Sequence, residues 1–118
     1  MDTQLLQAFC HSFPGVVAHE SDNAANVLTH KIQGKKFAYF KTSEPEQWRF
    51  SIRTYSDRFL ELTDQPGIKP AKYMHRFHWV TIVNVGSIDE RYLKELVTWS
   101  YEKALSSLSK KMQATIKA

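Results

Sequence analysis

The stretch that decides the fold is Lys69-Pro-Ala-Lys-Tyr-Met-His-Arg-Phe-His-Trp-Val-Thr-Ile-Val-Asn-Val-Gly-Ser-Ile-Asp-Glu90. It joins a basic, aromatic-rich loop to a segment rich in Trp, Val, Thr and Ile, which is typical of one or two strands. Ser87 and Glu90 then have the capping-box spacing, in which each side chain binds an orphan amide of the first helical turn. We therefore expect a long helix from this point to about Leu108, with one broad apolar face.

Upstream of this stretch, the pattern predicts a hairpin. Residues 26–32 alternate in polarity and residues 36–42 are rich in aromatic side chains, and a turn at residues 33–35 contains a glycine between them. Residues 16–25 are polar and are interpreted as a loop.

The cleanest alternation of apolar and polar side chains follows the hairpin and predicts a third strand. Here we expect Trp48, Phe50 and Ile52 to pack inward, while Arg49 and Arg53 face outward on the uncovered side of the sheet.

Three other helical segments complete the chain. They are predicted from helix caps and helix breakers. A polar side chain before a helix can bind the amides of its first turn, and a Pro-Gly pair ends the helical pattern of apolar residues. They are a first helix capped by Asp2 or Thr3 and ended by Pro14-Gly15, a short helix capped by Thr54 or Ser56 and ending before Pro66-Gly67, and a final basic turn capped by Ser109.

The expected order is thus helix, three strands, helix, one or two strands, helix, or α-β-β-β-α-β(β)-α. Strands in series joined by tight turns predict an antiparallel sheet, and the helices are expected to cover one of its faces. The sequence indicates a two-layer α+β fold forming a single domain over residues 1–118.

Composition narrows the class of protein. One cysteine, Cys10, excludes an intrachain disulfide, and no apolar run is long enough to span a bilayer, so a cytoplasmic protein is expected. The net charge is +4, but it is segregated: residues 31–53 hold six bases and two acids, and residues 65–88 hold three bases and no acid. Such segregation produces a positive face, although basic residues also simply fill solvent-facing positions.

Several segments of the chain have a characteristic order and spacing: Gly34-Lys-Lys-Phe-Ala38, Lys41-Thr42, Lys69-Pro-Ala-Lys-Tyr-Met74, His78-Trp-Val80 and Ser100-Tyr101. In these segments, over nearly its whole length, the chain resembles the bacterial MmcQ/YjbR family. The resemblance implies a small α/β fold similar to secretion chaperones, with helices on one twisted antiparallel sheet. It also implies DNA binding through two projecting hairpins and no assigned enzymatic activity. Related chains tend to have Asn-Lys where this chain has His75-Arg76.

The candidate site is a nucleic-acid interface. A glycine turn with two lysines and a basic loop with aromatic side chains can contact phosphates, and the expected partner is double-stranded DNA bound with low sequence specificity. The alternative is a solvated loop whose aromatic residues anchor it to the core. The residues expected to bind DNA are Lys35, Lys36, Lys69, Lys72, Tyr73 and Arg76.

Other functions have weaker signals. His75 and His78 lack further ligands nearby, so neither a metal nor another cofactor is expected, and no nucleophile elbow or phosphate-cradling glycine motif predicts an enzyme. The alternative to DNA binding is a protein-interaction module, which would expose an apolar patch near Tyr39 or Trp79 or form a dimer. We expect a monomer.

Overall fold

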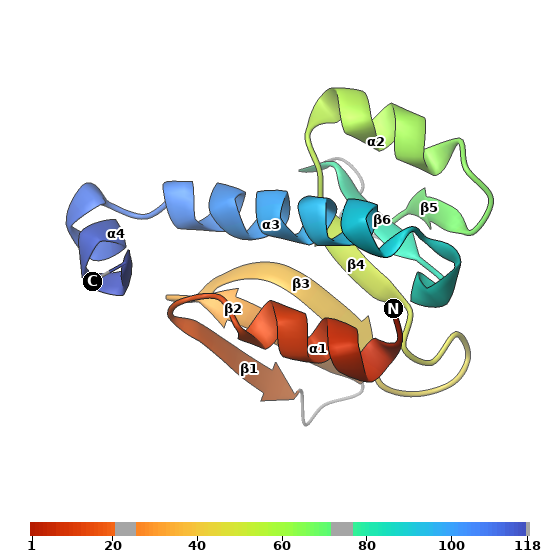
Figure 1. Cartoon of the computed structure of the whole chain (residues 1–118), viewed down its shortest axis with the longest axis horizontal. Helices are drawn as coiled ribbons and strands as arrows, with labels where there is room; N and C mark the ends of the chain where they lie inside the picture. The colour runs from red at the N-terminus through yellow and green to blue at the C-terminus, as the bar shows by residue number, and fades with distance from the viewer. Residues whose placement is uncertain (21–25, 72–76, 118) are drawn as a thin grey trace.

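The computed structural model describes residues 1–20, 26–71 and 77–117. Within them, every strand pairs antiparallel with its neighbours in one sheet. The strands are β1 (Val16–Glu20), β2 (Val27–Ile32), β3 (Lys35–Lys41), β4 (Phe50–Arg53), β5 (Ile68–Pro70) and β6 (Trp79–Ile82). Their order across the sheet is β1-β2-β3-β4-β6-β5, so residues 16–20 and 68–70 supply the two edges (Figure 1).

The second layer is made of helices. Figure 1 shows α1 (Thr3–His11) and α3 (Glu90–Ser106) lying across one side of the sheet, with α2 (Ser56–Thr63) next to β5 and β6. A short α4 (Lys110–Lys117) follows α3 beyond the end of the sheet. The predicted two-layer α+β fold, with an antiparallel sheet covered by helices on one face, is confirmed. None of the described helices is long and apolar enough to cross a bilayer.

The core lies between the sheet and the helices. Because residues paired across antiparallel strands point to the same side, Phe40, Phe50 and Ile82 form one buried row through their cross-strand pairing. The apolar faces of α1 and α3 pack against this row, as Leu6 and Leu93 are fully buried in the same cluster. One sheet face is therefore committed to the core and the other is not.

Two ionisable side chains are buried in this core. Burial raises the pKa of the Cys10 thiol to about 12, which keeps it protonated. Burial lowers the pKa of His30 to about 4, helped by the nearby charge of His11. The His30 ring lies among Phe37 and Phe40, and its Nδ1 has no hydrogen-bond partner among the described residues. His30 is thus neutral in the folded protein.

The structure corrects the predicted extent of the sheet. Residues 16–20 form β1, so the loop predicted from residue 16 is wrong there, while residues 21–25 lie outside the described residues. Four of the five β1 side chains are exposed, so the β1 sequence lacks the apolar alternation of a half-buried strand. β5 is a three-residue edge strand that ends at Pro70. The predicted order allows a second strand between α2 and α3, but it was expected within residues 78–85 and not at the start of the basic loop.

Two predicted helix caps are wrong. Asp89, not Ser87, caps α3, because its carboxylate accepts from the Tyr92 amide at 3.0 Å. The Ser87 hydroxyl instead donates to the Asn84 carbonyl at 2.7 Å, which removes it from the helix. α2 begins after Tyr55 without a side-chain cap, so neither Thr54 nor Ser56 has that role. The caps predicted at Asp2 and Ser109 are confirmed, since their side chains accept from the Leu5 and Met112 amides at 2.8 Å and 3.2 Å.

One predicted core residue is also wrong, because Trp48 does not pack inward. It precedes β4 in a turn with φ of 71° and remains 36% exposed. Phe50 and Ile52, its partners in the predicted alternation, are fully buried as expected. The strand therefore begins later than the alternation indicates.

Candidate nucleic-acid interface

The side of the sheet opposite the described helices carries polar, aromatic and basic side chains, and we call it the helix-free face. Its members alternate along the strands with the core residues, except at a β-bulge in β3, where Phe37 and Ala38 are both buried, and cross-strand pairing connects them from β2 to β5. They are Thr29, Lys31, Lys36, Tyr39, Ser51, Arg53, Lys69, Trp79 and Thr81.

A tight turn places two of these lysines opposite each other. Gln33 and Gly34 have φ values of 47° and 79°, the positive values that a two-residue hairpin turn requires. Lys31 on β2 consequently pairs with Lys36 on β3. Like charges directly opposite on a sheet repel each other. No carboxylate in the described part of the chain forms an ion pair with either lysine.

Lys36 is held against a pair of aromatic rings. The Tyr39 and Trp79 rings stack with centroids 5.6 Å apart, and they meet over β4, where the small side chain of Ser51 leaves room. The Lys36 ammonium lies 4.9 Å from the Tyr39 centroid and 5.3 Å from that of Trp79. Burial lowers the pKa of Lys36, and repulsion from Lys31 lowers it further. The arrangement concentrates positive charge at a defined point.

The opposite edge of the helix-free face is electrostatically different. The Glu46 carboxylate, in the loop between β3 and β4, bonds the Lys69 ammonium at 3.0 Å and the Arg49 guanidinium at 2.9 Å. Hydrogen bonds lower the pKa of Glu46, and the bond from Lys69 has a larger effect than the bond from Arg49. Lys41 donates to the Pro45 carbonyl at 2.6 Å. Arg49, expected to face outward on the uncovered side of the sheet, is therefore tied into this loop, and so is Lys41.

The predicted site residues fall into three groups. Lys35 and Lys36 lie together at the start of β3, and Lys69 lies on β5, three strands away. At about 4.8 Å per strand, β3 and β5 lie roughly 14 Å apart across the sheet. Lys72, Tyr73 and Arg76 lie outside the described residues. Lys31 was not among the predicted site residues, although counting outward from the Gln33-Gly34 turn would have paired it with Lys36.

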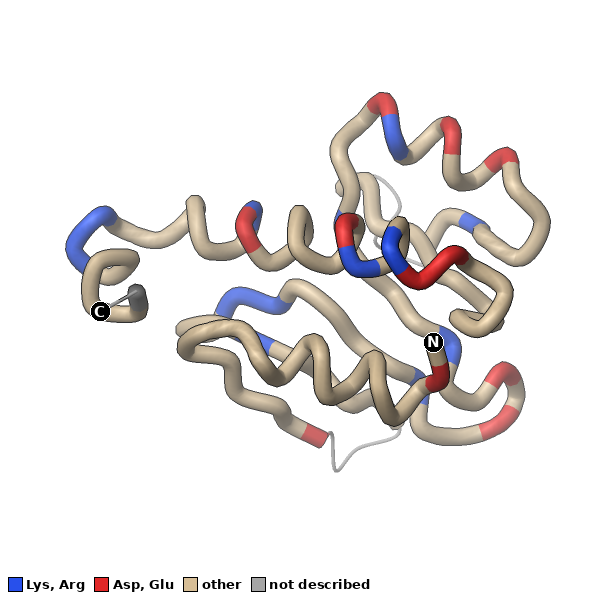
Figure 2. Tube along the Cα trace, in the orientation of Figure 1, with Lys and Arg blue, Asp and Glu red and all other residues tan. Residues whose placement is uncertain are grey.

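Charge is segregated by element. The described strands carry six Lys or Arg and one acid, Glu20, whereas α2 carries two acids and one arginine. Figure 2 shows acidic positions along α2 and at the start of α3, and basic positions at the hairpin of β2 and β3. The sheet is thus the basic layer of the structure.

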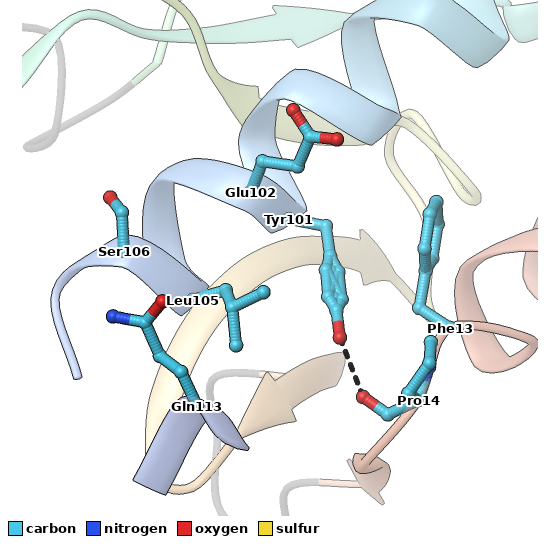
Figure 3. A pocket seen from close by; sticks show the side chains of 7 residues that line it. All are labelled: Phe13, Pro14, Tyr101, Glu102, Leu105, Ser106 and Gln113. Atoms are coloured by element: carbon cyan, nitrogen blue, oxygen red, sulfur yellow. Dashed lines mark hydrogen bonds between the residues drawn. The ribbon is translucent and has the colours of Figure 1, made fainter. Parts of the chain in front are cut away.

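Two hollows bear on the enzyme alternative. His78 lines a small one whose described lining contains no carboxylate. The other has a volume of about 400 Å³ and lies between the end of α1 and the last turns of α3 (Figure 3). There the Tyr101 hydroxyl donates to the Pro14 carbonyl at 2.7 Å, which ties α3 to the end of α1, and burial raises the pKa of Tyr101. Each lining contains a hydroxyl and a possible base, Ser106 with Glu102 in one and Ser56 with His78 in the other. Within the described part of the chain, no hydrogen bond joins the two side chains of either pair, and the Ser106 hydroxyl donates to the Lys103 carbonyl instead.

Comparisons with known proteins define the family. The comparison with curated proteins finds no match. A crystal structure of a Deinococcus radiodurans protein with the domain DUF419 is similar with a TM-score of 0.85 and 20% identity, covering 98% of this chain and 88% of that one. A crystal structure of a Pseudomonas syringae protein has a TM-score of 0.69 and 14% identity, covering 88% and 99%. These two likenesses concern the fold alone. In sequence, residues 11–103 match the YjbR family, and the chain belongs to that family.

Proposed function

We propose that the protein binds DNA through the helix-free face and the hairpin between β2 and β3, without catalysing a reaction. The observation that supports this most is the cross-strand pair of Lys31 and Lys36, which has no carboxylate partner among the described residues. A phosphate placed between two ammonium groups offsets their repulsion, so the free protein favours such a ligand.

The contacts in this proposal are to the DNA backbone. Lysine is a point charge without the planar fork that reads base edges, and Lys31, Lys35 and Lys36 therefore position the protein without specifying a sequence. Trp79 is only 3% exposed and lies beneath Lys36, so its ring supports the ammonium rather than stacking on a base. Low sequence specificity follows from this chemistry.

Lys69 has a secondary role in the proposal. Glu46 must release it before it contacts a phosphate, and an exposed ion pair of this kind costs about 1 kcal/mol or less to break. Lys72, Tyr73 and Arg76 remain in the proposal on sequence grounds. We place this role in the cytoplasm, as the single cysteine indicates.

The test is a titration of a fluorescently labelled DNA duplex at about 50 mM salt, a concentration at which phosphate contacts dominate affinity. K31Q/K36Q removes the lysine pair, and R91Q/K94Q removes the same charge from α3 on the opposite layer. We expect K31Q/K36Q to weaken binding at least tenfold, a change of about 1.4 kcal/mol. The control should bind within a factor of about three of the wild type. No binding by the wild type, or equally weakened binding in both variants, would remove the proposal.

One observation favours a second function, a protein-interaction module. β1 is an edge strand whose Val17 is 64% exposed, and such a strand can pair with a strand of another protein. Trp79 is almost fully buried, so it does not contribute the exposed apolar patch that this function was expected to use. Light scattering of the wild type and of V17K tests it: a dimer in the wild type that dissociates in V17K would support it, and a monomer in both would count against it.

A further inference from the structure

The hollow between the end of α1 and the last turns of α3 lies outside the proposed DNA interface (Figure 3). Its volume of about 400 Å³ is within the roughly 300–1,000 Å³ of small-molecule pockets. Helical spacing places Glu102, Leu105 and Ser106 on one face of α3, and Gln113 of α4 lines the hollow as well. Residues from three separate parts of the chain therefore form it.

One wall of the hollow is aromatic and fixed in position. The Phe13 and Tyr101 rings meet edge to face, with their centroids 4.5 Å apart. The Tyr101 hydroxyl donates to the Pro14 carbonyl at 2.7 Å, and the Tyr101 and Leu105 side chains are almost fully buried. α4 is anchored in turn, because Ile116 packs against the core cluster. A flat ring can therefore pack on this wall without reordering it.

Most of the polar side-chain atoms that the lining leaves available are hydrogen-bond acceptors. The Ser106 hydroxyl already donates to the Lys103 carbonyl at 2.8 Å. The Gln113 amide nitrogen gives one of its two hydrogens to the Leu108 carbonyl, also at 2.8 Å. One amide hydrogen of Gln113 is then left as a donor in the described lining. The acceptors are the two Glu102 carboxylate oxygens, the Gln113 Oε1 and the Ser106 oxygen.

The charge of the lining points to a cation. Glu102 is the one charged side chain in the described lining, and no Lys or Arg of the described residues forms an ion pair with it. Glu102 and Ser106 are four residues apart on α3, a spacing that brings their Cβ atoms to about 5–6 Å. One donor group of a ligand can therefore contact both side chains.

We propose that the hollow binds a primary ammonium carried on an aromatic ring, the chemistry of an arylalkylamine. An ammonium has three donors and no acceptor, which complements a lining rich in acceptors, and the ring packs on Phe13 and Tyr101. A ligand carboxylate or phosphate would instead face the Glu102 carboxylate without a cationic partner in the described lining. Two sources share this chemistry: a free amine and the amino-terminal aromatic residue of a peptide. The site does not rest on DNA binding, because it shares no residue with the helix-free face.

The test is an NMR titration of the isotope-labelled protein with phenethylamine at constant ionic strength and about pH 7, where an alkylamine is protonated. We expect the Ser106 amide and the Gln113 side-chain amide to shift together. E102Q keeps the shape of the side chain and should weaken binding about fivefold, the upper range for an exposed ion pair. E95Q removes the same charge from α3 outside this lining and should leave the affinity unchanged. No binding by the wild type, or equally weakened binding in both variants, would overturn the proposal.

Related ligands test each part of the proposal. Phenethyl alcohol, which lacks the charge, and ammonium chloride, which lacks the ring, should each bind at least about fivefold more weakly than phenethylamine. L-Phenylalanine adds a carboxylate to the same ring and ammonium, and it should bind at least about tenfold more weakly. Binding by any of these three ligands that equals the binding of phenethylamine would contradict the proposal. L-Phenylalaninamide separates the two sources: tighter binding than that of phenethylamine identifies a peptide, and equal or weaker binding identifies the free amine.

Discussion

Ser100 connects the helical layer to two strands of the sheet, and its substitution by alanine should be severely destabilising. Its hydroxyl donates to the Phe37 carbonyl at 2.6 Å and accepts from the Arg53 amide at 3.2 Å, and the residue is 1% exposed. S100A leaves a carbonyl and an amide without partners in a dry environment. At about 1–3 kcal/mol for each of the two unsatisfied groups, the expected destabilisation is about 2–6 kcal/mol. That is a large part of a total stability of roughly 5–15 kcal/mol.

Urea denaturation measures this destabilisation. With a slope near 2 kcal/mol per molar urea, the midpoint should fall by about 1–3 M while the slope stays constant. The control is S106A on the same helix, because the exposed Ser106 hydroxyl bonds only the Lys103 carbonyl at 2.8 Å. It should change stability by less than about 0.5 kcal/mol. If S100A and S106A have the same midpoint, the Ser100 bridge contributes nothing to the joining of the layers and the reasoning is refuted.

Three other predictions follow from buried or strained positions. Because the folded-state pKa of His30 lies near 4, below the ordinary 6.5, the neutral ring's contribution to stability is complete above pH 6.5 and declines as pH falls toward 4. In urea titrations at several pH values, the free energy of unfolding should fall by up to about 3 kcal/mol over this range, and by less in H30L. A wild-type free energy of unfolding that does not change with pH would contradict this prediction. G15A, at φ 78° with a Cβ 3.0 Å from the Ile116 side chain, should lower the melting temperature more than G34A, at φ 79° in open space. Equal shifts would show that the Ile116 contact is irrelevant. Cys10, with a pKa raised from 9.0 to about 12, should react with a thiol reagent about a thousandfold more slowly in the native than in the urea-unfolded protein, and rapid native labelling would exclude its burial.

The elements with a buried face could be predicted from the sequence. Phe50 and Ile52 alternate with polar residues because one side of β4 faces α3, and the long apolar stripe of α3 faces the same core. β1 could not be predicted, since it is held mainly by hydrogen bonding to β2 and most of its side chains are exposed. Burial of one face requires apolar residues at regular intervals in the sequence, whereas backbone pairing at the edge of a sheet does not.

The helix caps show a second limit on what can be predicted from the sequence. Ser87 and Asp89 both offer an oxygen at a suitable spacing from a helix start, and the sequence cannot choose between them. In the structure Ser87 is used by the turn at Asn84, so the helix begins after Asp89. Competition between two local hydrogen bonds decided the boundary.

The candidate site was predictable in part. Lys35 and Lys36 were identified from the glycine turn, but Lys31 required the register that the turn imposes. The pairing of Lys69 with Glu46 joins residues 23 positions apart, and no local pattern encodes it. Contacts between elements distant in sequence therefore set which lysines are neutralised.

The salt dependence of duplex binding tests the central claim, that unpaired lysines on the helix-free face contact DNA phosphates. The slope of the logarithm of the binding constant against the logarithm of salt concentration should decrease in magnitude by about two for K31Q/K36Q, at roughly 0.9 for each phosphate that the variant no longer neutralises. R91Q/K94Q should keep the wild-type slope. A K31Q/K36Q variant with the wild-type slope would show that these ammonium groups do not touch phosphate, and the account of this face would be wrong.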